Sequence, residues 1–107
     1  MSVAEPDVID GAGIGSQGEL RLLITDHLPW DGFEDFEYEH LELLQNKINA
    51  YLGYIESRQF EQNFPERHFE RFVIEVAFQH EPTAACTKFL AVARETARAL
   101  NTTIERS

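Results

Sequence analysis

The sequence predicts an α+β fold, a two-layer sandwich in which two helices pack on one face of a small three- to four-stranded sheet. Two segments repeat apolar residues at the three- and four-residue spacing of an amphipathic helix. Two others alternate with the two-residue period of a strand. Together with two shorter extended pieces, they follow one another in the order β-β-α-β-α-β. With 107 residues, of which 43% are hydrophobic, the chain is expected to form a single domain with its own core.

The first elements are expected to form a hairpin. Residues 1–6 are predicted to be a flexible tail, Val8 and Ile9 are expected to start a short strand, and residues 12–14 are expected to form another short extended piece. Residues 15–18, Gly-Ser-Gln-Gly, indicate a turn, and residues 13–18 also match the glycine pattern of dinucleotide-binding folds. That pattern needs a helix after it, whereas residues 19–26 alternate as a strand, so a hairpin turn is favoured.

A loop over residues 29–35 is predicted to lead into the first helix. Pro29 lacks an amide donor, and either Asp31 or Asp35 is expected to cap the helix by accepting from its free amides. The helix is predicted from about Glu37 to Ser57. Its apolar stripe consists of Leu41, Leu44, Ile48, Tyr51, Leu52 and Ile55.

The second half of the chain supplies one strand, one helix and an edge strand. Residues 69–79 form the clearest alternating pattern of the sequence. A helix is predicted over residues 82–100, with proline in its favoured first turn and Asn101 ending it in a left-handed turn. Residues 102–105 are β-prone and are expected to add a last edge strand.

The face of the sheet that the helices leave open is predicted to be partly apolar. Leu23, Val73 and Ala77 fall on it by their position in the alternating strands. A partly apolar open sheet face is a candidate interface between two copies of a chain. We therefore predict these three residues as a candidate interface and a homodimer as a candidate assembly.

The net charge of −10 is confined to the first half of the chain. Residues 1–57 hold 12 acidic and 2 basic residues, whereas residues 58–107 hold 7 of each sign. Such a surface repels phosphate backbones, so no nucleic-acid partner is predicted. It favours a basic protein partner, although the same charge can act only to keep the protein soluble.

The sequence favours a cytoplasmic protein. Cys86 is the only cysteine, so no intrachain disulfide forms, which suits a reducing compartment. The acidic N-terminal segment does not read as a signal peptide. No apolar run approaches the roughly 20 residues of a membrane helix, so no membrane partner is predicted.

The candidate functional cluster consists of Asp26, His27, Trp30, Glu37 and His40. Asp26 and His27 follow a strand at the start of a loop, where functional side chains often lie, and a carboxylate can orient an imidazole for acid–base work. Alternatively, Trp30 closes the end of the core, and Asp26 or His27 bonds loop amides. Catalytic residues stay unknown.

No cofactor and no metal site is predicted. Glu37 and His40 form one Glu-x-x-His pair, whereas di-iron bundles need two such pairs and further glutamates. A looser metal site from His27, His40 and Glu37 matches no ligand-spacing motif. Cys86 is expected to be a small core residue, since its helical surroundings are rich in alanine.

Several stretches resemble a family of small bacterial domains of unknown function. They are Ile24-Thr25-Asp26-His27-Leu28 with Trp30, then Glu39-His40-Leu41, Leu43-Leu44-Gln45, Lys47 to Leu52 and Tyr54 to Ser57. The resemblance covers roughly residues 8–100 and departs from the family over residues 31–36. It implies a bacterial source, brings no established activity, and adds no catalytic residue.

Two functions are compatible with the sequence. The first is a non-enzymatic protein–protein interaction module, for example an immunity-type protein that binds a basic partner. The second is a small enzyme or metal-binding protein that uses the region of Asp26, His27 and His40. We favour the first, because no complete catalytic constellation is present.

Overall fold

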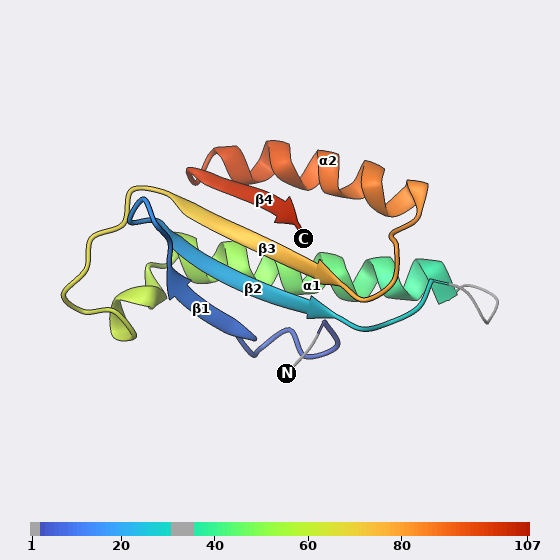
Figure 1. Ribbon diagram of the computed structural model, residues 1–107, viewed down its shortest axis with the longest axis horizontal. Coiled ribbons are helices and arrows are strands. Elements are labelled where there is room, and N and C mark those ends of the chain that lie inside the picture. The colour runs from blue at the N-terminus through green and yellow to red at the C-terminus, as the bar shows by residue number, and fades with distance from the viewer. Residues whose placement is uncertain (1–2, 31–35) are drawn as a thin grey trace.

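The structure, a computed structural model, describes residues 3–30 and 36–107 and contains one four-stranded sheet and two α-helices in β-β-α-β-α-β order (Figure 1). This confirms the predicted α+β fold. The elements are β1 (Gly11–Ile14), β2 (Leu20–Asp26), α1 (Phe36–Glu56), the short 3₁₀ helix η1 (Gln59–Gln62), β3 (Phe72–Phe78), α2 (Ala84–Arg98) and β4 (Thr102–Arg106).

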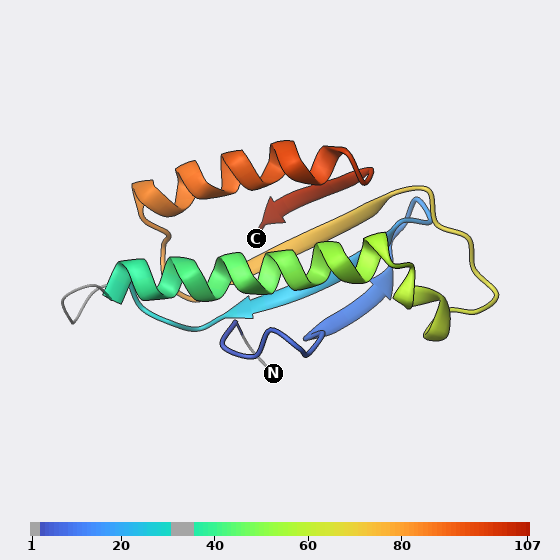
Figure 2. The same ribbon diagram turned by 180° about the vertical axis from the view of Figure 1, so that it is seen from behind.

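The strands lie in the order β1-β2-β3-β4 across the sheet. β1 pairs with β2 in antiparallel fashion, and β2, β3 and β4 run parallel. Each parallel pair is joined through a helix, as parallel pairing requires. Both helices contribute to one core, and in Figures 1 and 2 α1 spans the length of the sheet on a single side of it.

The core is built by the alternation of β2 and β3. Leu20, Leu22 and Ile24 are completely buried, as are Ile74 and Val76, whereas the residues between those of β2 are only half-buried. The register pairs Leu22 with Ile74 and Ile24 with Val76, so the buried side chains of both strands meet beneath the helices. The predicted assignment of faces is therefore confirmed.

Two elements begin later in the structure than the sequence predicts, because local contacts compete with the periodic pattern. The predicted strand over residues 69–79 begins only at Phe72, because Phe69 packs against Phe60 and Phe64 at ring distances of 5.9 and 5.7 Å. The predicted helix over residues 82–100 begins at Ala84, because the hydroxyl of Thr83 caps it by accepting from the Cys86 amide.

The N-terminal segment packs against the body of the protein. Val3, placed by the sequence in a flexible tail, is fully buried, and its amide donates to the Thr25 carbonyl at 2.9 Å. Residues 31–35, which include the predicted caps Asp31 and Asp35, lie outside the described residues.

Candidate functional site

Asp26 and His40 meet in the interior of the protein. Asp26 is the last residue of β2, and His40 lies in the first turns of α1. His40 Nε2 lies 2.6 Å from Asp26 Oδ2 and 2.7 Å from Oδ1, and both side chains are 0% exposed. The contact therefore ties the end of a central strand to the beginning of the helix that covers it.

The hydrogen-bond partners of His40 determine which of its ring nitrogens carry a hydrogen. Nδ1 lies 3.1 Å from the carbonyl oxygen of Pro29, and a carbonyl only accepts, so Nδ1 carries a hydrogen and donates it. A single further proton then lies between Nε2 and Asp26. Whether it resides on the imidazole or on the carboxyl, the pair has no net charge, which is the condition under which such groups tolerate burial.

Trp30 covers this pair. Its ring stacks on the His40 ring with centroids 3.5 Å apart and planes 18° from parallel, and it is 8% exposed. Phe78 packs on Trp30 at 6.1 Å. The indole Nε1 is buried and makes no hydrogen bond within the described part of the chain. Trp30 thus closes the end of the core over His40.

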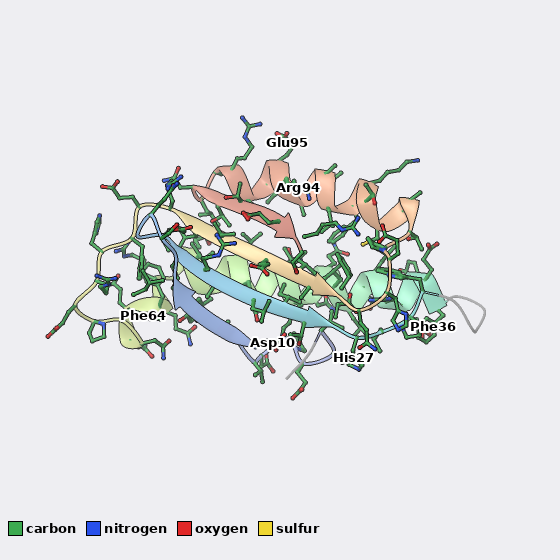
Figure 3. All side chains as sticks on the ribbon, viewed as in Figure 1. Asp10, His27, Phe36, Phe64, Arg94 and Glu95 are labelled. Carbon is green, nitrogen blue, oxygen red and sulfur yellow. The ribbon has the colours of Figure 1, made fainter. Side chains whose placement is uncertain are left out.

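The five residues of the predicted candidate cluster do not all lie together in the structure. Asp26, Trp30 and His40 lie together. His27 is exposed at the margin of the molecule (Figure 3), and Glu37 is half-buried. A second bond of Asp26 is local, because its Oδ1 accepts from the Leu28 amide at 3.1 Å. This is the loop-amide role that the sequence offered as the alternative to catalysis.

Cys86 belongs to the same end of the core and is fully buried. Burial, together with the negative charges of Asp26 and Glu37, raises the pKa of its thiol to about 12, although Arg106 acts in the opposite direction. The thiolate is the nucleophilic form, so this cysteine is unreactive at neutral pH. Within residues 3–30 and 36–107, no three His, Cys, Asp or Glu side chains are grouped as metal ligands would be.

Lys47 forms a second buried polar cluster, which sequence reasoning missed. Its side chain is 0% exposed, and its ammonium donates to Asp10 Oδ1 at 3.0 Å and to the carbonyls of Val8 and Glu5. The signal was present in the sequence, because position 47 lies three residues after Leu44 and therefore falls on the apolar stripe of α1.

Asp10 links this cluster to the sheet. Its Oδ2 accepts from the Thr25 amide at 2.9 Å, and its own amide donates to the hydroxyl of Tyr51 at 2.8 Å. The Tyr51 hydroxyl in turn donates to the Leu23 carbonyl at 2.6 Å. Burial raises the pKa of Tyr51, so this hydroxyl keeps its proton at neutral pH.

Arg21 organises the open face of the sheet. Its guanidinium contacts the carboxylates of Glu19, Glu75 and Glu105 at 3.2, 3.2 and 3.3 Å. The bond to Glu75 is the largest of the influences that raise the pKa of Arg21. This face is therefore more polar at its centre than the alternating pattern alone suggests.

The three residues of the candidate interface lie around this ion-pair network. Leu23 and Ala77 are half-buried, and Val73 is 7% exposed. In the register of the sheet, Arg21 lies opposite Val73 and Leu23 lies opposite Glu75. The apolar side chains are thus separated by charged ones.

These contacts sharpen the charge asymmetry of the chain. Arg21 and Lys47 are the only basic residues among residues 1–57, and each is paired with carboxylates of the same chain. Lys47 is also removed from solvent. The negative charge on this half of the surface is therefore not offset by a free cation from the same half.

The solvent-facing side of α1 displays this charge. Its exposed residues are Tyr38, Glu39, Glu42, Gln45, Asn46, Asn49, Gly53 and Glu56. Three of them are glutamates and none is basic. Tyr38 is 68% exposed, which is unusual for an aromatic side chain and typical of contact surfaces. We refer to these eight residues as the acidic helix face.

None of the described helices has the length and apolar character needed to cross a bilayer.

Comparison with known proteins places the chain in a family without assigning it an activity. No curated protein matches the sequence, and no solved structure matches the fold. The family model for a family of unknown function, DUF6572, matches residues 1–107 from end to end. The chain therefore belongs to this family of unknown function, in agreement with the resemblance seen in its sequence.

Proposed function

We propose that the protein is a non-enzymatic binding module that recognises a basic protein partner through its acidic helix face. One observation carries the proposal: the exposed side of α1 has three carboxylates and no cation, and both basic residues of the same half of the chain are paired with carboxylates. Unpaired surface charge of one sign steers a partner of the opposite sign and raises its association rate.

The burial of the Asp26–His40 pair supports a binding role over an enzymatic one. A general base must come within hydrogen-bond reach of a substrate proton. Both ring nitrogens of His40 already face protein oxygens, and Trp30 stacks on the ring. The geometry is that of a structural pair.

A narrower form of the proposal is an immunity-type protein, which binds and blocks a basic toxin. Its support is the combination of a small size, a net charge of −10 and an acidic surface on one long helix. If the partner is toxic when expressed alone and harmless when co-expressed with this protein, the narrower form holds.

The test is co-purification from the native host at low and at high salt. The Glu39→Gln, Glu42→Gln, Glu56→Gln variant removes the three charges of the acidic helix face without changing the shape of the side chains. We expect this variant to lose the partner that the natural protein retains, and we expect high salt to weaken retention, because the contacts are electrostatic.

A matched control removes three charges elsewhere. Glu66, Glu70 and Glu95 are exposed glutamates of the second half of the chain. The variant that carries glutamine at these three positions has the same net charge as the first variant, and it should retain the partner. Equal retention by both variants would show that the position of the charge does not matter, which contradicts the proposal.

A further inference from the structure

The outer edge of β1 carries backbone groups that pair with no other strand within residues 3–30 and 36–107. β1 is the terminal strand of the sheet and pairs only with β2. The Gly15 amide donates to the Glu19 carbonyl at 2.8 Å, and hydrogen-bonded and open positions alternate along an antiparallel pair. Gly13 and Gly11 therefore face β2, while the amides and carbonyls of Ala12 and Ile14 face outward. Both of these residues are exposed.

A groove of about 660 Å³ runs beside this edge, on the helix side of the sheet. Ala12 points into it, since its register partner Leu22 is a core residue. Its apolar lining also includes Ile9, Ala50, Tyr54 and Phe64. Ile9 and Ala12 line the groove on the side of the N-terminal segment and β1, and Ala50 and Tyr54 line it on the side of α1, so the groove lies between β1 and α1.

The groove favours a basic occupant. Asp7 is the only charged residue in its lining and is exposed, and no basic residue lines the groove among the described residues. A second copy of the chain is a poor occupant, because it brings a further net charge of −10 to the same edge.

We propose that an extended, basic peptide segment of the partner adds to the sheet as a fifth strand along β1. The outward amides and carbonyls of Ala12 and Ile14 supply the backbone hydrogen bonds of strand addition. Alternate side chains of the peptide fill the groove between β1 and α1, and the intervening ones project from the opposite face of the sheet. The inference rests on the proposed function, since it specifies how the basic partner is held.

The structure ends the pairing register at Asp10. The Asp10 amide donates to the buried hydroxyl of Tyr51, so it is not available to an added strand. The added strand is therefore limited to the length of β1, and its specificity comes from the groove. A short edge with a lined groove favours a selected segment over general aggregation.

The experiment uses the full chain and a synthetic peptide of about eight residues that alternates lysine and valine, long enough to span a typical strand. Nuclear magnetic resonance measures hydrogen exchange at single amides. We expect the peptide to slow exchange of the Ala12 and Ile14 amides at least about tenfold, as one or two new hydrogen bonds would. The Gly13 amide, which already faces β2, should change little.

Two control peptides distinguish the contribution of backbone hydrogen bonding to binding from the contribution of the peptide's charge. A peptide with the same sequence that is N-methylated at alternate residues cannot donate along one edge, and we expect it not to bind. A peptide that alternates glutamate and valine keeps the strand propensity and reverses the charge, and it should bind far more weakly. Slowed exchange with either peptide equal to that with the first would overturn the proposal.

Ala12→Pro is the decisive variant. It removes an outward donor and leaves the hydrogen bonds between β1 and β2 in place, because proline is tolerated at edge positions whose amide faces solvent. We expect at least about a tenfold loss of peptide affinity. Gly13→Ala is the matched control, because a methyl group there meets nothing within 4 Å, and it should bind normally. Circular dichroism verifies that both variants fold.

A second variant leaves β1 untouched. Asp7→Lys reverses the only charge of the groove lining, and we expect it to weaken binding of the lysine–valine peptide. Unchanged affinity in both Ala12→Pro and Asp7→Lys would overturn strand addition at this edge. A dimer that sedimentation detects and Ala12→Pro dissolves would also overturn it, by identifying a second copy as the occupant.

Failure of this inference is distinguishable from failure of the proposed function. If Ala12→Pro retains the native partner while the triple glutamine variant of the acidic helix face loses it, strand addition is wrong and the binding module stands. If both variants retain the partner, both proposals fail.

Discussion

His40 Nε2 and Asp26 Oδ2 lie 2.6 Å apart, with neither side chain reaching solvent. The contact spans 14 residues of sequence and crosses residues 31–35. It joins β2 to α1 at one end of the domain, while Lys47 and Asp10 join the N-terminal segment to α1 nearer its middle. The stability of the fold therefore depends on two buried polar contacts as well as on apolar packing.

His40→Ala is expected to lower the free energy of unfolding by about 3–5 kcal/mol, because it leaves the Asp26 carboxyl buried without its partner. Urea denaturation followed by circular dichroism measures the change. His27→Ala is the control, since His27 is exposed and its loss should stay within about 0.5 kcal/mol. Similar losses in the two variants would contradict a structural role for the pair.

Lys47→Met is expected to destabilise the protein by a comparable amount, about 3–5 kcal/mol, although methionine fits the apolar stripe of α1. The variant removes the buried ammonium that donates to Asp10 Oδ1 and to the Glu5 and Val8 carbonyls. Hydrogen exchange at the Val3 amide should accelerate more than exchange in β3, because the N-terminal segment loses its anchor. Uniform acceleration would place the effect elsewhere.

Stability is expected to fall as the pH rises from about 9 toward 12. The Cys86 thiol has a pKa near 12 in the folded protein against an ordinary value of 9.0, so the folded state holds this proton more tightly than the unfolded state does. Its contribution is complete below pH 9 and declines as the pH increases. Burial also raises the pKa of Tyr51, which adds to the decline.

Cys86→Ala tests the share of the thiol in this decline. The variant should lose stability less steeply over the same pH interval, as measured by urea denaturation at several pH values. A thiol reagent gives an independent measurement, because Cys86 should react at pH 8 only after the protein unfolds. An identical pH profile in the variant would show that the thiol does not contribute.

Gly18→Ala and Gly13→Ala are expected to have opposite effects. Gly18 has a φ angle of +80°, in the left-handed region, so a side chain there costs about 1–2 kcal/mol. At Gly13 an added Cβ meets nothing within 4 Å, and alanine should stabilise the strand by about 0.5–1 kcal/mol. Thermal unfolding measures both changes. A loss at Gly13 as large as that at Gly18 would contradict this description of the hairpin.

The sequence predicted those parts of the fold that are encoded by local periodicity. The stripe of α1 and the alternation of β2 and β3 each follow from residues close in the chain, and both are found in the structure. The order of the strands was left open, because β3 lies between β2 and β4 through long crossover connections that no local pattern encodes.

The site was harder to predict, because it depends on pairs that are distant in sequence. Asp26, Trp30 and His40 were identified as candidates, and they do lie together. His27 was grouped with them because it is adjacent to Asp26, but the strand ends at Asp26 and the two side chains separate. Lys47 was counted only in the charge balance and was not identified as a buried residue, since its partners Asp10 and Glu5 lie about forty residues earlier.

The buried contacts of Lys47 also limit when the N-terminal segment can pack during synthesis of the chain. The Lys47 ammonium that donates to the Glu5 carbonyl lies 42 residues later in the chain, and the Tyr51 hydroxyl that accepts from the Asp10 amide lies 41 residues later. A nascent chain emerges from its N-terminus, so the N-terminal segment leaves the ribosome first and docks only after α1 has been made. The element at the beginning of the sequence is thus among the last whose contacts can be completed.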